Sequence, residues 1–328
     1  MKDPRYPFDR VQSVESLRHP LGVLPTDLAQ LARRASDMYF VAKTQLKADG
    51  STRILYDTQE PLKIVLKRIN ENFLKRVIYP SYLTGGLPGK DYTHSVRVHA
   101  GAKVVVKEDI SQFFPSVSHE VVFDIWKNFF GFAAEVAELL TMLTVRDGHL
   151  EQGAPTSGYL ANLALWDIEG QFVKNLAAQG FTQYSRHVDD ITFSSLSHVS
   201  PSRINWAVRT VTKSLATKGL LIHQGKHEVM HSNGQLKILK LVGNSKPSLP
   251  PKERSRVRAL IHTFSKKVES GDDLEDALQM LPRMRGQAYK VKRFHSREGG
   301  LLVEQVEKAA VLLRLQPSNA DVYTGQPN

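Results

Sequence analysis

The chain has 328 residues, of which 41% are hydrophobic, contains no cysteine and carries a formal net charge of +11. A globular protein of one to three domains is expected; disulfides and thiolate metal sites are excluded, and the polar amino terminus holds no secretory signal, which fits a cytoplasmic location. The positive charge favours polyanionic partners, and the longest apolar stretch, residues 121–145, carries too many charges to span a membrane.

Helices and strands alternate without a repeat in the first half of the chain. Apolar side chains follow helical spacing in residues 1–45, which predicts a helical extension. A strand over residues 52–56 and a helix over residues 61–78 are expected next. Residues 103–107 are rich in β-branched side chains and predict a strand that leads directly to Asp109.

The second half begins with expected helices over residues 118–145 and 158–176. Two strand-like runs then flank a pair of aspartates, and a helix is expected over residues 201–218. Asn233-Gly234 is a strong turn signal and predicts a hairpin between two strands in residues 220–241. After a proline-containing linker the chain becomes basic and helical.

The adjacent aspartates Asp189 and Asp190 are the most informative feature of this sequence. They interrupt two strand-like runs, which predicts the turn of a β-hairpin. Carboxylates gathered at one point repel each other unless a cation lies between them, and hard oxygen ligands suit Mg²⁺. Asp109 adds a third carboxylate if its strand joins the same sheet, although alone it is better explained as a strand end. The other pair, Asp272 and Asp273, is typical of the acidic first turn of a helix.

Several segments, in order along the chain, resemble the motifs of bacterial reverse transcriptases. The closest resemblance is to the retron and related anti-phage reverse transcriptases. The matching segments are residues 109–116 for motif A, 152–157 for motif B, 188–190 for motif C, Lys226 for the lysine of motif D, and 50–54 with 62–63 for the fingers.

The resemblance implies an α+β fold, that of a right-handed polymerase with an antiparallel palm sheet. Residues 1–45 would be the N-terminal helical extension, 46–245 the fingers and palm, and 246–328 a basic helical thumb. The implied activity is RNA-directed DNA polymerisation from dNTPs, with two Mg²⁺ ions as cofactor and Mn²⁺ as an alternative. The implied partners are a structured non-coding RNA template, its DNA product and a companion effector protein in anti-phage defence.

The resemblance also assigns roles to individual residues. Asp109 and Asp189 would bridge both ions with help from the backbone carbonyl of Ile110, and Asp190 would lie beside them. The residues expected to hold the nucleotide are Arg53 at the triphosphate, Phe114 as a steric gate against the ribose 2′-hydroxyl, Gln152, Gly153, and Lys226 at the leaving pyrophosphate. Solvated strand-edge cations remain the alternative for Arg53 and Lys226, and core packing for Phe114.

Over half of the excess charge lies in residues 246–300, which contain thirteen Lys and Arg against seven Asp and Glu. This distribution predicts a grip on nucleic-acid phosphates, with a solvated basic surface as the alternative. His187 stands where the family usually has a tyrosine, and we expect it near a primer end. The other expected nucleic-acid contacts are Arg254, Arg256, Arg258, Lys266, Arg283, Arg285 and Lys290.

Two other functions stay open at this stage. One is an RNA-binding scaffold that has kept the fold but lost or altered catalysis. The other is a zinc peptidase, because residues 227–231 match the signature H-E-x-x-H. That chemistry needs both histidines on one face of a helix, whereas the neighbouring turn residues predict a strand. The template, the priming mode, the effector and the oligomeric state are not specified by the sequence.

Overall fold

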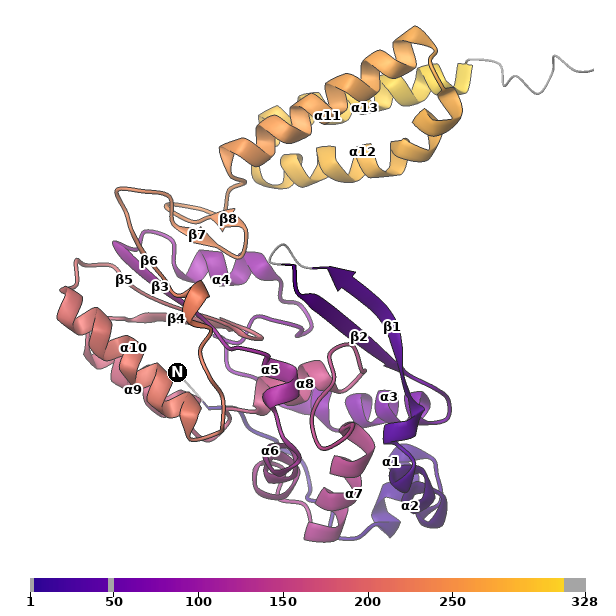
Figure 1. The fold of residues 1–328 in the computed structure, drawn as a ribbon, viewed down its shortest axis with the longest axis vertical. Helices are drawn as coiled ribbons and strands as arrows, with labels where there is room; N and C mark the ends of the chain where they lie inside the picture. Colours follow the sequence, from indigo (N-terminus) through magenta and orange to yellow (C-terminus); the bar gives the residue numbers. More distant parts are fainter. Residues whose placement is uncertain (1–2, 47–49, 316–328) are drawn as a thin grey trace, which may run out of the picture. The chain divides into compact units, whose positions relative to one another are not determined.

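The computed structural model describes residues 3–46 and 50–315. The chain divides into two compact units, Met1–Leu236 and Lys237–Asn328 (Figure 1). Residues 237–245, which the sequence analysis placed in the preceding domain, lie in the second unit by this division. No helix in the described ranges is long and apolar enough to cross a membrane.

The described part of the first unit begins with a non-helical segment, residues 3–14, which leads to short helices and then to a two-stranded ribbon. The helical segments are η1 Glu15–Leu17, α1 Arg18–Leu21, α2 Pro25–Arg33 and η2 Ser36–Met38. Strand β1 (Tyr39–Leu46) then pairs antiparallel with β2 (Thr52–Thr58). The expectation of helix throughout residues 1–45 is therefore wrong for the last seven of them, and also for residues 3–14, which precede the first helical segment. Aromatic and β-branched side chains dominate the start of β1, and they favour an extended ribbon over a helical turn.

A four-stranded antiparallel sheet forms the centre of the first unit. Its strands, in spatial order, are β4 (Gln183–His187), β5 (Asp190–Ser195), β3 (Val104–Asp109) and β6 (Glu228–His231). This confirms the expected antiparallel sheet and the hairpin around the aspartate pair.

The predicted hairpin at Asn233-Gly234 is wrong. Strand β6 pairs with β3, whereas β7 (Lys237–Ile238) pairs with β8 (Leu241–Val242). The amide of Gly234 still donates to the carbonyl of His231 at 3.0 Å. The Asn233-Gly234 sequence therefore forms a turn, but β6 pairs with β3, a strand distant in sequence, instead of with the strand that follows the turn.

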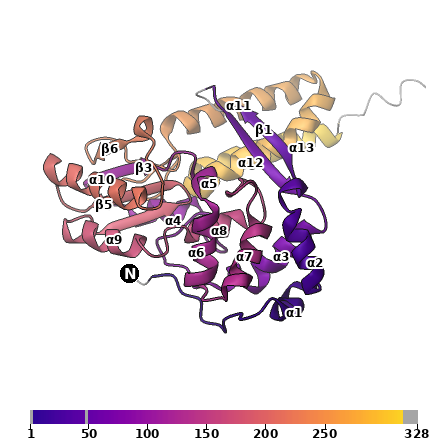
Figure 2. The same cartoon turned by 60° about the horizontal axis from the view of Figure 1, so that its bottom comes forward.

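Helices and short helical turns surround this sheet (Figures 1 and 2). They are α3 Leu62–Asn72, η3 Leu74–Arg76, α4 Tyr92–Val98, α5 Phe113–Ser116, α6 His119–Asp124, η4 Ile125–Phe129, α7 Ala134–Thr144, α8 Ser157–Leu163, α9 Glu169–Ala178, α10 Pro201–Ala216 and η5 Gln224–Lys226. The single helix expected over residues 158–176 is broken between α8 and α9. Trp166 lies in the break, and its indole N–H donates to Asp124 Oδ2 at 2.9 Å.

The two faces of the sheet have different chemistry. On one face Tyr184 packs edge-on against Phe172 of α9, with ring centroids 5.8 Å apart, and α10 lies beside α9 (Figures 1 and 2). On the other face His99, at the end of α4, contacts Ser194 Oγ through Nδ1 at 2.7 Å and Ser185 Oγ through Nε2 at 2.9 Å. Burial lowers the pKa of His99 to about 3, so its ring is neutral.

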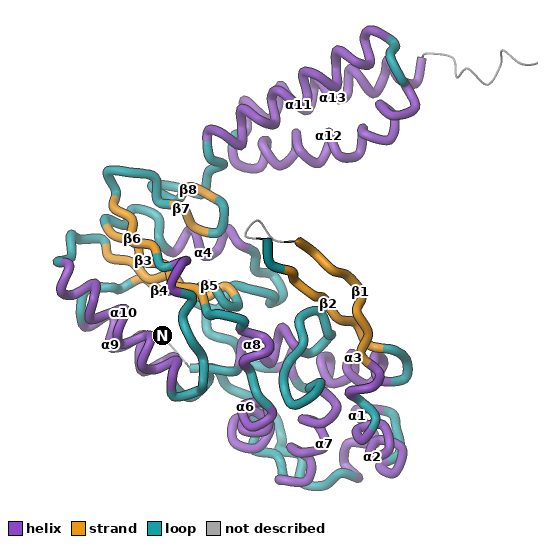
Figure 3. The backbone as a smooth tube through the Cα atoms, viewed as in Figure 1, coloured by secondary structure: helices purple, strands orange, loops and turns teal. Residues whose placement is uncertain are grey.

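The described part of the second unit consists of the small β7–β8 pair and the helices α11 (Pro251–Ser270), α12 (Leu274–Phe294) and α13 (Ser296–Leu315), which the tube of Figure 3 shows as purple coils. Buried apolar side chains from all three helices, such as Ile261, Met284 and Val306, form its core. Asp273 accepts from the amide of Asp276 at 3.3 Å, so the second aspartate pair does begin a helix.

Candidate functional site

The turn between β4 and β5 carries the aspartate pair to the end of β3. Asp190 lies directly opposite Asp109 in the strand register, so both side chains project from the same face of the sheet. The amide of Ile110 donates to the carbonyl of Asp189 at 3.0 Å, which joins the turn to β3. Three carboxylates from two distant segments therefore lie close enough for their charges to interact.

The electrostatics of the three carboxylates follow from this proximity. Burial, with repulsion from Asp189 and Asp109, raises the pKa of Asp190 from 3.8 to about 6. Burial also raises the pKa of Asp189, with repulsion from Asp109 opposed by the nearby charges of Lys226 and Arg53. The site therefore holds more negative charge than its surroundings neutralise, and an added cation would be stabilised there.

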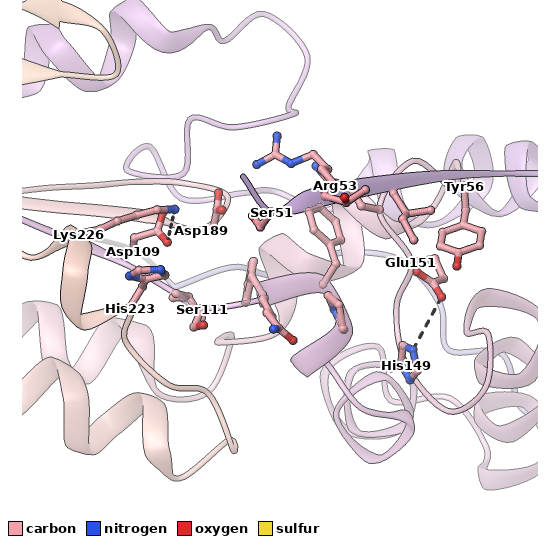
Figure 4. Close-up of a pocket in the computed structure, with 18 residues that line it drawn as sticks. Ser51, Arg53, Tyr56, Asp109, Ser111, His149, Glu151, Asp189, His223 and Lys226 are labelled. Atoms are coloured by element: carbon pink, nitrogen blue, oxygen red, sulfur yellow. Dashed lines mark hydrogen bonds and ion pairs between the residues drawn. The ribbon is translucent and has the colours of Figure 1, made fainter. Parts of the chain in front are cut away.

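Lys226 is the nearest cation to this cluster. Its Nζ lies 2.8 Å from Asp109 Oδ1, and the dashed line in Figure 4 marks this ion pair. Burial opposes the lysine charge, but the hydrogen bond to Asp109 and the three negative charges outweigh it and raise the pKa of Lys226. The segment is held in place by the amide of His223, which donates to the carbonyl of Asp109 at 2.8 Å. Lys226 thus stands where a bound cation would compete with it.

A cavity of about 630 Å³ opens beside the carboxylates, within the first unit. It is lined by Arg53 from β2, Phe114 from α5, Gln152, Asp109, Asp189 and Lys226. Figure 4 shows Arg53 on the β2 side of this cavity and Asp109 and Lys226 on the sheet side. Most of the residues expected to hold a nucleotide are therefore brought together.

Gly153 is not among the residues that line the cavity. It has φ of +110°, and a Cβ there would lie 2.4 Å from the carbonyl oxygen of Tyr56. The amide of Tyr56 donates to the carbonyl of Gln152 at 2.8 Å. The close approach that requires glycine is thus to β2, and it fixes the position of the neighbouring Gln152.

The two adjacent phenylalanines have different environments. Phe113 is only 3% exposed and packs in the core, although part of it reaches the cavity. Phe114 is half-buried and lines the cavity, with its ring centroid 6.1 Å from that of Phe113. Phe113 therefore supports Phe114, whose face is available to a ligand.

His187 lies opposite Asp190 in the β4–β5 register and shares its face of the sheet. Its Nδ1 is 3.3 Å from Thr84 Oγ1, and that hydroxyl is 2.6 Å from Ser95 Oγ. Burial lowers the pKa of His187, although the charge of Asp189 opposes this shift. The ring is therefore held in place by hydroxyl groups beside the carboxylates.

Residues that the sequence did not indicate also line the cavity, among them Tyr56, His149, Glu151 and His223. Glu151 is 7% exposed, accepts from Arg146 at 3.0 Å and lies 3.7 Å from His149 Nε2 (Figure 4). Arg146 in turn stacks over the Tyr56 ring, 4.6 Å from its centroid. Glu151 could have been found from the sequence by its position, since it immediately precedes Gln152.

The donor set at the carboxylates fits a divalent metal ion such as Mg²⁺. Asp109, Asp189 and Asp190 offer hard oxygen atoms, and burial, together with repulsion among the carboxylates, raises the pKa values of Asp189 and Asp190. Among the described residues, no group of three or more His, Asp or Glu is already arranged around a metal position. Mg²⁺ commonly takes one or two carboxylates and completes its shell with water and substrate phosphates, so this partial set is sufficient.

The H-E-x-x-H segment does not form a peptidase site. His227 precedes strand β6, and His231 ends it, so the two histidines do not share a helix face. His227 Nδ1 instead contacts the buried Glu108 Oε1 at 2.7 Å. These contacts support the segment that carries Lys226.

In the second unit, ion pairs engage most of the expected nucleic-acid contacts. Glu298 accepts from Arg254 at 2.9 Å and also pairs with Arg258, while Glu253 lies 2.9 Å from both Arg256 and Lys290. Arg285 pairs with Glu307 at 2.5 Å. Neither Lys266 nor Arg283 forms an ion pair with another described residue. The paired cations brace the helices, and several keep exposed surface for a polyanion.

Known proteins resemble this chain over most of its length. The family described as reverse transcriptase (RNA-dependent DNA polymerase) matches residues 45–264. The chain is 31% identical over 267 residues to the retron Ec48 reverse transcriptase of Escherichia coli, covering 77% of this chain and 65% of that protein, just under two thirds. It is 28% identical over 321 residues to the retron Se72 reverse transcriptase of Salmonella heidelberg, covering 97% and 83%. A solved telomerase structure from Candida albicans aligns with 77% of this chain and over 53% of the telomerase chain, with a TM-score of 0.38 and 10% identity. This similarity is too low to support a conclusion about this protein.

Proposed function

Because the chain belongs to the reverse transcriptase (RNA-dependent DNA polymerase) family, we propose that it extends DNA along an RNA template at the cavity beside Asp109. One observation carries this proposal. Asp109 and Asp189 line one cavity together with Lys226, Phe114 and Gln152, and Asp190 lies opposite Asp109 in the strand register. A scaffold that no longer catalysed would have no need to keep this repulsive cluster intact.

The residues divide the work of nucleotidyl transfer among them. Divalent metal ions held by Asp109, Asp189 and the Ile110 carbonyl would lower the pKa of the attacking hydroxyl and stabilise the leaving pyrophosphate. Asp190, on the same face, keeps the local charge negative. Lys226 moves from Asp109 to the pyrophosphate, where it supplies a positive charge or a proton.

The remaining cavity residues position and select the nucleotide. Arg53 offers a guanidinium fork to the triphosphate oxygens from the β2 side. Phe114 presents its ring where a ribose 2′-hydroxyl would lie and favours dNTPs. Gln152 is fixed against β2 by its carbonyl bond to Tyr56, so its side chain meets the incoming nucleotide in a defined place.

Similarity to retron reverse transcriptases supports a proposal for the template and the setting. We expect a structured non-coding RNA as template and partner, a DNA product, and a companion effector in anti-phage defence. The basic helical second unit acts as the thumb, and the first unit supplies fingers and palm. Lys266, Arg283 and the exposed cations of the ion pairs contact the nucleic-acid backbone, while His187 contacts the primer end.

Primer extension by purified protein tests the proposal. Wild type with Mg²⁺, dNTPs and an RNA template should extend a DNA primer, and Asp189→Asn should abolish extension without unfolding the protein. Asp272→Asn, at the start of α12, is the matched control and should extend normally. Extension that persists in Asp189→Asn would reject this site, and no extension by wild type on any RNA that co-purifies with it would favour the scaffold alternative.

A further inference from the structure

The turn that carries the aspartates has an unusual backbone conformation. Val188 has φ of +63°, in the left-handed region that β-branched residues avoid. Its neighbour on one side is Gly85, where a Cβ would lie 2.6 Å from Val188 Cγ2 and 2.7 Å from its amide nitrogen. Such a conformation persists only where surrounding contacts hold it.

Arg186, two residues before the turn, supplies such a contact from inside the protein. Its side chain is fully buried, on the face of the sheet opposite the catalytic carboxylates. Nη1 donates to the carbonyl of Val188 at 3.0 Å. The guanidinium therefore holds the carbonyl of the strained residue directly.

The guanidinium is itself fixed by every hydrogen bond it can make. Glu169 of α9, only 3% exposed, accepts from Nε at 2.6 Å and from Nη2 at 2.8 Å. The carbonyls of Asn162 and Ala161 accept from Nη2 at 2.8 Å and from Nη1 at 3.4 Å. With the bond to Val188, all five N–H donors have an acceptor, and only arginine offers that fork.

The same network reaches the other side of the turn. Asn162 Nδ2 donates to the carbonyl of Gly85 at 2.8 Å, so one residue of α8 contacts both Arg186 and the loop that packs on Val188. The amide of Thr84 donates to the Arg186 carbonyl at 2.9 Å. The turn is thus clamped between the guanidinium and the Gly85 loop.

We propose that Arg186, oriented by Glu169, is a positioning residue that holds Val188 left-handed and thereby aims Asp189 and Asp190 at Asp109. The inference rests on the proposed polymerase function. Neither Arg186 nor Glu169 lines the cavity, and their effect passes through the backbone of the turn. Because small displacements of reacting groups cost large factors in rate, their removal should lower the rate of chemistry.

Replacing both Arg186 and Glu169 tests their positioning role without leaving one buried charge unpaired. Removing one member would strand a buried charge, whereas an apolar pair of similar volume is generally tolerated. The test variant is therefore Glu169→Leu with Arg186→Met, compared in primer extension with wild type and Asp189→Asn. The control is Asp167→Leu with Lys218→Met, a more exposed ion pair at 2.7 Å whose lysine also lies 3.6 Å from Asp124 Oδ2.

For the test variant we expect kcat to fall about 100-fold while KM for the dNTP changes less than about threefold. Its thermal stability should be lower than that of wild type, because the buried Tyr184 hydroxyl, which donates to Glu169 Oε1 at 2.7 Å, loses its acceptor. The control pair should keep wild-type kcat. A folded test variant with wild-type kcat would overturn the inference. The polymerase assignment would still hold if wild type extends the primer and Asp189→Asn does not.

Two further variants test the turn itself, and the first of them is made in the wild-type chain, so it does not depend on the folding of the test variant. Gly85→Ala presses on Val188 from the other side and should lower kcat without changing the Arg186 pair. Asparagine adopts the left-handed conformation more readily than valine, so adding Val188→Asn to the test variant should raise its kcat about tenfold. Wild-type kcat in Gly85→Ala, or no recovery with Val188→Asn, would show that the pair does not act through the turn.

Discussion

Asp190→Asn should stabilise the metal-free protein while lowering its activity. Burial and repulsion raise the pKa of Asp190 from 3.8 to about 6. The folded carboxyl therefore binds its proton more tightly than the unfolded one, and ionisation costs the folded state stability as pH rises through this window. At about 1.36 kcal/mol per pKa unit, the upper limit of the gain in unfolding free energy is about 3 kcal/mol above pH 6, and partial exposure reduces the expected gain to about 1–2 kcal/mol.

Urea denaturation with EDTA present measures this effect. The protein has three tryptophans, Trp126, Trp166 and Trp206, all within the first unit, so their fluorescence reports the unit that contains the site. Asp190→Asn should raise the free energy of unfolding at pH 7.5. Near pH 4 this gain should largely disappear, because the folded Asp190 carboxyl is then protonated and as neutral as the amide that replaces it. A gain that is absent at pH 7.5, or equal at both pH values, would refute the electrostatic reasoning. Asp272→Asn controls for the substitution itself.

Two cavity residues, Lys226 and Phe114, and the neighbouring Gly153 give three predictions for primer extension. Lys226→Met should lower kcat about 10–100-fold with little change in KM, because its ammonium group leaves Asp109 for the pyrophosphate; an unchanged kcat would contradict this. Phe114→Ala should raise the use of rNTPs relative to dNTPs by about tenfold or more, measured as a ratio of kcat/KM. Gly153→Ala should raise the KM for dNTPs about tenfold, since its Cβ would meet the Tyr56 carbonyl at 2.4 Å and displace Gln152; normal KM would show that the loop adapts.

The sequence was sufficient for those parts of the site that local pattern controls. Asp189 and Asp190 interrupt two extended runs, and such a pattern predicts a turn wherever it occurs. Their meeting with Asp109 followed once both strands were placed in one sheet. Lys226 could be located only through resemblance, because nothing local distinguishes it from a solvated cation.

Other features depend on contacts between distant segments and could not be predicted. Arg186 in a strand resembles an exposed cation until Glu169, seventeen residues earlier, is placed against it. The partner of β6 is β3, more than a hundred residues before it, so the Asn233-Gly234 turn signal gave the wrong pairing. Gly153 was assigned to a ligand, whereas its close approach is to Tyr56.

The repulsion at Asp190 and the clamp at Arg186 should be coupled. Carboxylates on a free turn would move apart and relieve their repulsion, whereas a turn held through the Val188 carbonyl keeps them together. Asp190→Asn should therefore stabilise the metal-free protein less in the Glu169→Leu, Arg186→Met background than in wild type. A double-mutant cycle in urea at pH 7.5 measures the difference, expected at about 1 kcal/mol. Equal gains in both backgrounds would mean that the turn keeps its place without the guanidinium, and that the clamp and the charge cluster act independently.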